Sequence, residues 1–166
     1  PSNLSAWTTQ QFDPTLNWAD VEWIKKRWGG KLILKGIQDV EDARLAVESG
    51  ADALIVSNHG GRQLDGAESS INALPAIVDA VGNQIEVHMD GGIRSGQDVL
   101  KAVALGAKGV YIGRSFVYGL GAMGEAGVTK ALEIIHKEMD ITMALCGKTR
   151  IEHIDKSILL PGSYPT

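Results

Sequence analysis

The chain has 166 residues, 44% of them hydrophobic, and a formal net charge of -4. This acidic balance argues against a nucleic-acid-binding domain, which has a basic footprint. No apolar run approaches the roughly 20 residues of a membrane span, and the opening PSNLSAWTTQQ lacks the basic and apolar parts of a signal peptide. The single cysteine, Cys146, cannot form an internal disulfide, which favours a reducing compartment. The absence of an initiator Met is consistent with a piece of a longer protein.

Predicted helices and strands alternate along the chain. LNWADVEWIKKRW (16–28) predicts a helix with Val21, Ile24 and Trp28 on one face, and Trp28 is expected to pack in the core. Short apolar runs bounded by turn residues then predict strands, and helical spacing between them predicts helices. The expected strands are 31–37, 53–59, 85–92 and 109–114, and the expected helices are 40–50, 71–82 and 96–106. Pro75 leaves the start of the second of these helices open. A long outer helix from about Glu125 to Leu145 and an irregular tail with one short helix complete the chain.

This alternation predicts an α/β fold with a parallel sheet, because strand–helix–strand units join parallel strands. A weak internal repeat supports similar units: GADALIVSN begins at position 50 and GAKGVYIGR begins 56 residues later, at position 106. Repeated units favour a (β/α)8 TIM barrel over a Rossmann sheet, and such a barrel needs eight strands. We therefore expect residues 1–166 to form one unit, the C-terminal half of a barrel. Residues 1–15 would end an upstream loop, residues 147–166 would form a C-terminal tail, and the other half would come from a missing segment or a separate chain.

Polar residues cluster where each predicted strand ends, and these ends carry the chemistry of such barrels. The clusters are Lys35; Ser57, Asn58 and His59 with Arg62; Asp90, Gly91 and Gly92 with Arg94; and Gly113 with Arg114. The last two clusters, DGGIRSG and IGRS, fit a phosphate, because a loop-to-helix junction presents backbone N–H groups and a favourable dipole to an anion. Arg94 and Arg114 would add charge-assisted hydrogen bonds. The alternative is that these glycines only form turns and that the arginines are surface charges.

The segments KGI, SNHGGRQLD, DGGIRSG and IGR, in this order and spacing, resemble the FMN-dependent α-hydroxy acid oxidase and dehydrogenase family. That family includes glycolate oxidase, mandelate dehydrogenase and L-lactate dehydrogenase. SNHGGRQLDG and the LPAIVDAV helix are most similar to the bacterial L-lactate dehydrogenases. The resemblance runs from about Phe12 to Gly147 and covers the C-terminal half of a family member.

The resemblance implies a role for each strand-end residue. His59 would be the catalytic base, a task that needs a group working near neutral pH. Arg62 would bind the substrate carboxylate, which a planar guanidinium can do bidentately. Lys35 would stabilise charge that develops on the flavin during reduction. The remaining cofactor contacts would be Ser57 to the ring, Asp90 to the ribityl chain, and Gly91, Gly92, Arg94, Gly113 and Arg114 around the phosphate.

The family implies FMN-dependent oxidation of a small L-2-hydroxy acid, lactate foremost, to the 2-keto acid. It also implies an oxidoreductase that is active only with its N-terminal half, a homo-tetramer, and a cytoplasmic protein that could lie on the inner membrane through the upstream loop. Two other readings stay open: another phosphate-binding barrel enzyme, such as an isomerase or an IMP dehydrogenase-like protein, or an inactive fragment. The choice between oxygen and a quinone as electron acceptor also stays open. His88 is expected to face the barrel interior, and no residue cluster has metal-ligand spacing.

Overall fold

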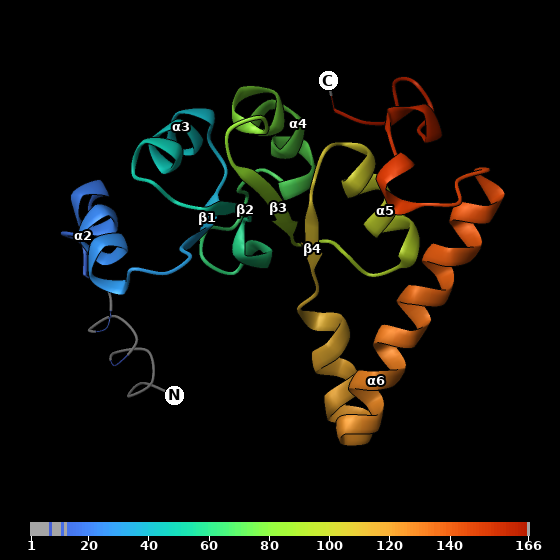
Figure 1. The fold of residues 1–166 in the computed structure, drawn as a ribbon. Coiled ribbons are helices and arrows are strands. Elements are labelled where there is room, and N and C mark those ends of the chain that lie inside the picture. Colours follow the sequence, from blue (N-terminus) through green and yellow to red (C-terminus); the bar gives the residue numbers. More distant parts are fainter. Residues whose placement is uncertain (1–6, 8–10, 12, 166) are drawn as a thin grey trace.

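A computed structural model describes residues 7, 11 and 13–165 and contains one sheet of four parallel strands (Figure 1). These strands are β1 (Ile33–Ile37), β2 (Ala53–Val56), β3 (Glu86–Asp90) and β4 (Gly109–Tyr111). Each strand pairs with the next strand along the chain, in the order β1-β2-β3-β4. This order confirms the predicted half of a (β/α)8 barrel.

The helices between the strands lie on one face of the sheet, with α3 and α4 seen above it in Figure 1. They are α3 (Val40–Glu48), α4 (Ser70–Val81) and α5 (Gly96–Ala104), preceded by α2 (Trp18–Trp28) and followed by α6 (Arg114–Leu145). Asp39 and Ser95 cap α3 and α5 by accepting backbone N–H bonds at the helix start. Pro75 lies inside α4, so the helix begins before it. The missing N–H of Pro75 removes one hydrogen bond of the helix, and the proline is buried.

The hydrophobic core lies between the sheet and these helices. Leu54 and Val56 of β2 and Val87 and Met89 of β3 are almost fully buried there. They alternate with side chains on the other face, as the strand period of two requires. The helices contribute buried residues that include Leu74, Ile77 and Val81 of α4.

The opposite face of the sheet carries rows of side chains that correspond to the interior of a barrel. Lys35 aligns with Ile55, and Ile55 aligns with His88, while Asp90 aligns with Tyr111. Such rows from neighbouring strands fill a complete barrel in layers. In this chain the face stays open, because the Lys35 side chain is 44% exposed and Tyr111 is 41% exposed.

The last helix, α6, has two arms, because the backbone angles of Met123 and Gly124 are not helical. The second arm, which ends at Leu145, confirms the helix predicted from about Glu125, whereas the first arm, which begins at Arg114, was not predicted. The break lies at the tip of the V that α6 forms in Figure 1. Gly119 and Gly127 allow the two arms to lie close together. A Cβ on Gly127 would stand only 1.8 Å from the carbonyl oxygen of Gly119, so a larger residue would not fit there. The second arm also packs on α5 at Gly96, where a Cβ would meet the backbone nitrogen of Met139 at 2.0 Å.

The predicted core position of Trp28 is wrong. None of the residues of α2 is buried, and Trp28 is 68% exposed, with its indole N–H donating to the carbonyl oxygen of Lys31 at 3.1 Å. The helix is attached by Trp18, which is partly buried against the hydrophobic core, and by Lys25, which forms an ion pair with Asp52 at the loop before β2.

The chain termini add little regular structure. The tail contains two 3₁₀ turns, Ile151–His153 and Lys156–Ile158, where one short helix was predicted. Most of the upstream loop expected over 1–15 lies outside the described residues. No helix among the described residues is long and apolar enough to cross a membrane.

Candidate active site

A cavity of about 480 Å³ opens at the C-terminal ends of the four strands. It is lined by residues from β1, from the last positions of β3 and β4, from the loops that follow β2, β3 and β4, and from the start of α6. Of the ten residues predicted for the site, all except Ser57 line it: Lys35, His59, Arg62, Asp90, Gly91, Gly92, Arg94, Gly113 and Arg114. The fold therefore brings together residues that lie up to 79 positions apart, from Lys35 to Arg114.

Lys35 is held at the floor of this cavity. Its Nζ lies 3.0 Å from Asp90 Oδ2 and donates to Ser57 Oγ at 3.0 Å. Ser57 is buried behind the lysine, which explains why it does not reach the cavity. The other carboxylate oxygen, Asp90 Oδ1, is buried and accepts no hydrogen bond from any described residue. A buried acceptor without a donor is costly, so Asp90 is suited to receive a hydroxyl group from a bound molecule.

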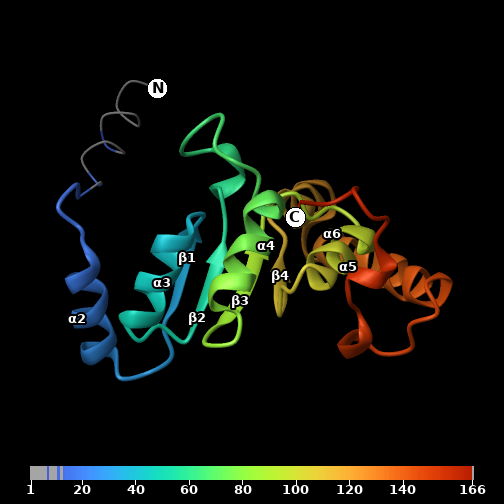
Figure 2. The same cartoon turned by 90° about the horizontal axis from the view of Figure 1, so that it is seen from above.

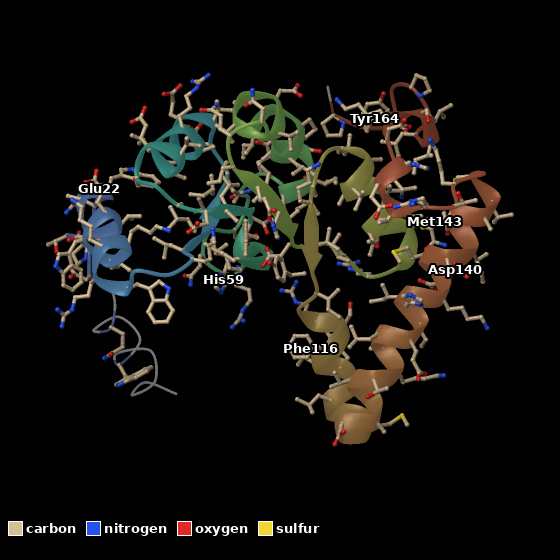
Figure 3. All side chains as sticks on the ribbon, viewed as in Figure 1. Glu22, His59, Phe116, Asp140, Met143 and Tyr164 are labelled. Carbon is tan, nitrogen blue, oxygen red and sulfur yellow. The ribbon has the colours of Figure 1, made fainter. Side chains whose placement is uncertain are left out.

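A tight turn after β2 presents His59. Three consecutive residues take the left-handed backbone conformation there: His59 with φ 54°, Gly60 with φ 65° and Gly61 with φ 70°. For a residue with a Cβ this conformation costs roughly 1–2 kcal/mol, so other contacts must hold it. The N–H of His59 donates to Ser57 Oγ at 3.1 Å, and the N–H of Gly60 donates to Asn58 Oδ1 at 3.0 Å. As a result His59 is exposed on the cavity side of the sheet (Figure 3).

Arg114 connects the other end of the cavity to this turn. Its Nη2 donates to the carbonyl oxygen of Gly60 at 3.1 Å, although Arg114 belongs to the first turn of α6. Among the described residues, no group accepts a hydrogen bond from the backbone N–H of Arg114 or Ser115, as is usual at a helix start. This junction can therefore receive an anion.

The junction before α5 differs from the sequence-based expectation. The N–H groups of Arg94 and Ser95 donate to Asp98 Oδ2 at 3.0 and 3.1 Å. The next N–H, of Gly96, donates to Glu138 Oε2 at 2.9 Å. Protein carboxylates thus occupy the N–H groups that were expected to bind a phosphate at this helix start. What remains there for an anion is the Gly91–Gly92 turn and the Arg94 side chain, all on the cavity lining.

The sequence interpretation missed Tyr111, which also lines the cavity. Its hydroxyl lies 3.0 Å from His88 Nδ1, and His88 Nε2 lies 3.2 Å from Glu86 Oε2. His88 faces the inner side of the sheet, as expected, and Gly109 opposite it leaves room for the ring, since a Cβ there would stand 2.7 Å from Nδ1. The sequence could have predicted this position of Tyr111. Side chains two positions apart point to the same face of a strand, so Tyr111 shares the inner face with Gly109. Among residues 7, 11 and 13–165 no group of His, Cys, Asp or Glu is arranged to hold a metal ion.

Comparisons with known proteins agree with this geometry. Residues 1–161 match the family model described as FMN-dependent dehydrogenase. The chain is 54% identical over 157 residues to an L-lactate dehydrogenase of Caulobacter sp. (strain K31), covering 95% of this chain and 41% of that protein. It is also 54% identical over 154 residues to an L-lactate dehydrogenase of Pseudomonas syringae pv. syringae, covering 93% of this chain and 40% of that protein.

Solved structures give the same picture. The monotopic membrane protein (S)-mandelate dehydrogenase matches with a TM-score of 0.87 and 40% identity, over 93% of this chain and 41% of that chain. Flavocytochrome b2 with sulfite bound matches with a TM-score of 0.85 and 41% identity, over 89% of this chain and 39% of that chain. The chain thus spans about two fifths of the length of these relatives. Since the family model covers almost all of it, the chain belongs to the FMN-dependent dehydrogenase family.

Proposed function

We propose that this chain is the C-terminal half of an FMN-dependent enzyme that oxidises a small L-2-hydroxy acid, lactate foremost, to the corresponding 2-keto acid. The observation that carries the proposal is the meeting of His59, Arg62, Lys35 and Asp90 around one cavity at the strand ends. These residues supply a base, a carboxylate-binding cation, a second fixed cation and a free acceptor. The names of the L-lactate dehydrogenase relatives support lactate as the substrate.

The cavity fits FMN in three respects. Asp90 Oδ1 is a buried acceptor without a donor, which suits a ribityl hydroxyl. Lys35 is a cation held in place by Asp90 and Ser57, which suits the edge of a flavin ring where negative charge develops. The open helix start at Arg114, with the Arg94 side chain, suits the phosphate. When bound, FMN supplies the two-electron acceptor for the oxidation.

His59 and Arg62 would do the chemistry on the substrate. Both are exposed on the same turn and both line the cavity, so one small acid can touch both side chains. The Arg62 guanidinium binds the carboxylate and thereby orients the α-carbon. The neutral His59 imidazole then takes a proton from the substrate, either from the hydroxyl or from the α-carbon.

The rest of the barrel would complete the site. The inner face of the sheet is open in this chain, and the chain spans about two fifths of its relatives, so we assign the missing strands to an N-terminal half. We extend the proposal to a homo-tetramer that lies in the cytoplasm, with peripheral attachment to the inner membrane. The description of the similar (S)-mandelate dehydrogenase as a monotopic membrane protein supports the attachment.

Anaerobic stopped-flow reduction of the complete enzyme tests the proposal. L-lactate, glycolate and mandelate are each mixed with the protein while flavin absorbance is followed. His59→Gln should keep the flavin and bind oxalate, a non-reacting acid, but should reduce the flavin about 10²–10⁴-fold more slowly, the usual scale of general base catalysis. A near-normal rate in this variant would place the base elsewhere. A complete protein that binds no flavin would favour another phosphate-binding barrel enzyme.

A further inference from the structure

Asn58 joins three segments around the turn that carries His59. Its carboxamide oxygen accepts the N–H of Gly60 at 3.0 Å, and its carboxamide nitrogen donates to the carbonyl oxygen of Glu68 at 3.3 Å. Its backbone N–H donates to Ser70 Oγ at 3.2 Å, at the start of α4. The residue therefore fastens the turn after β2 to both the far end of its own loop and the next helix.

The loop after β3 closes over the same carboxamide. A Cβ on Gly91 would stand 3.3 Å from Asn58 Oδ1 and 3.1 Å from Ser70 Oγ, so the glycine lets the Asp90–Gly91 loop lie close against Asn58. The side chain is half-buried between these segments and does not line the cavity. Asn58 can thus act on a bound molecule only through the residues that it holds.

The turn needs such a support. His59 has a left-handed backbone that its Cβ disfavours, and the two residues after it share that conformation. The Asn58 oxygen bonds the N–H in the middle of this run, and the carbonyl oxygen of Asn58 accepts the N–H of Gly61 at 3.0 Å. Without the carboxamide, the turn would lose the bond to its central N–H, and the bonds from Ser57 Oγ and the Asn58 carbonyl oxygen would hold the left-handed backbone of His59 less firmly. That change would redirect its side chain away from its present place on the cavity.

We propose that Asn58 is a positioning residue, whose carboxamide holds the left-handed turn 59–61 so that the His59 imidazole stays on the cavity. This inference rests on the proposed function of His59 as the base. Arg62 follows the turn, and its N–H donates to the carbonyl oxygen of His59, while no hydrogen bond among the described residues joins Arg62 to the Asn58 side chain. Loss of the carboxamide should therefore affect proton transfer more than substrate binding.

The test uses the complete flavoenzyme with three variants: Asn58→Ala, His59→Gln and the double variant. The limiting rate of anaerobic flavin reduction by L-lactate should fall about 10–100-fold in Asn58→Ala, the scale of a small misplacement of a catalytic group. FMN retention and the dissociation constant of oxalate should stay within about threefold of the wild type. The double variant should be no slower than His59→Gln alone, because a residue that acts through the imidazole has nothing to position once it is absent.

Asn17→Ala is the matched control. Asn17 also accepts an N–H two residues ahead, from Ala19 at 3.0 Å, but it caps α2 and does not line the cavity. Its removal should leave the reduction rate unchanged. Asn58→Asp keeps an acceptor for the Gly60 N–H and loses the donor to Glu68, so its rate should lie between those of the wild type and Asn58→Ala. This variant also provides a measurement if Asn58→Ala does not fold.

Other results of these measurements would overturn either the positioning role of Asn58 or the assignment of His59 as the base. A normal rate in Asn58→Ala, with a slow His59→Gln, overturns the positioning role and leaves the base assignment intact. A normal rate in His59→Gln overturns the base assignment itself. Additive losses in the double variant, or loss of flavin and oxalate binding together with the rate in Asn58→Ala and Asn58→Asp, also overturn the inference, because the carboxamide would then act independently of His59 or support the whole fold.

Discussion

Arg62 and Lys35 are both cations on the cavity, yet they have different surroundings. Lys35 is fixed between Asp90 and Ser57, whereas Arg62 is exposed on the turn after β2. A lysine in place of Arg62 would keep the charge but lose the planar fork that binds a carboxylate through two hydrogen bonds. We expect Arg62→Lys to raise KM for lactate at least tenfold and to lower kcat, because a loosely held substrate presents its α-carbon poorly. Steady-state kinetics measure both, and Arg44→Lys on the surface of α3 is the control. An unchanged KM would remove Arg62 from substrate binding.

Arg114 has two tasks in the proposed enzyme, since it lies at the open start of α6 and also bonds the carbonyl oxygen of Gly60. Replacement by alanine should weaken FMN binding by about 1.5–3 kcal/mol, the value of a hydrogen bond to a charged group. Fluorescence titration of the apoprotein with FMN measures this change. Arg150→Ala, which removes an arginine paired with Glu152 in the tail, should leave the affinity unchanged. Equal affinity in Arg94→Ala, Arg114→Ala and the wild type would reject the phosphate assignment.

At the scale of the strands, the pairing of β3 with β4 depends on a small residue opposite a large one. A Cβ on Gly109 would stand 2.7 Å from His88 Nδ1 and 3.0 Å from Cε1, so Gly109→Ala must displace the ring and its bond to Tyr111. We expect a loss of roughly 1–3 kcal/mol in the free energy of unfolding, as for other overpacked sites. Adding His88→Ala should recover part of that loss, which a double-mutant cycle of unfolding measurements reports. Gly121→Ala, where nothing lies within 4 Å, should not destabilise the protein. Independent effects of the first two substitutions would contradict the packing argument.

The attachment of α2 to the sheet should depend on pH. The ammonium of Lys25, the N–H of Leu32 and the ammonium of Lys31 all bond the Asp52 carboxylate and hold its pKa far below the usual range. A carboxylate whose pKa is lower in the folded state stabilises that state above its unfolded pKa of about 4, and the stabilisation is lost as the pH falls from there toward the folded value.

Asp52→Asn removes this contribution. The variant should have a lower unfolding temperature than the wild type at pH 7, and the difference should shrink as the pH falls below about 4. Thermal unfolding between pH 7 and 3, followed by circular dichroism, measures this trend. A difference that does not change with pH would show that the charge of Asp52 does not stabilise the fold. Asp79→Asn on the exposed side of α4 controls for a general effect of removing a carboxylate.

Local patterns predicted most of the elements, because strand period and glycine stops act over a few residues. The strand ends likewise predicted nine of the sixteen residues that line the cavity, since parallel strands bring their C-terminal ends to one edge. The predictions that were wrong concern features that depend on contacts between distant residues or on breaks in the backbone. The hydrogen bond from the Gly96 N–H to Glu138 joins positions 42 residues apart. It occupies an N–H group at the start of α5 that the sequence predicted to be available for a phosphate. The first arm of α6, from Arg114 to the break at Met123, was missed because the glycines around position 121 weaken the helical pattern. The exposure of Trp28 could not be read from its helical face, because burial depends on what packs against that face.

At the scale of the whole molecule, the four parallel strands follow one another in the order β1-β2-β3-β4, as in one half of a barrel wall, with α3 and α4 against the sheet (Figure 2). Parallel sheets are normally covered on both faces, and here the face that carries Lys35 and Tyr111 is open. Ile33 on the same face is 47% exposed, and β1 and β4 each have an unpaired edge within the described chain. Exposed edges and apolar patches promote association with other chains.

Residues 1–166 should therefore associate when they are produced alone and should form a defined complex when the N-terminal half is supplied as a second chain. Sedimentation velocity would show mixed large species in the first case and one stoichiometric species in the second. The complex should also bind FMN, because the phosphate and ribityl contacts proposed here lie on this half, while the other half would cover the open inner face of the sheet. A control pairing in which Lys35→Glu reverses the charge on the inner face should still associate but should bind FMN much more weakly, since the fixed cation is lost. The outcome that contradicts the half-barrel is a soluble, monomeric chain that unfolds cooperatively by itself, because such a chain would have covered its inner face and its strand edges without a partner.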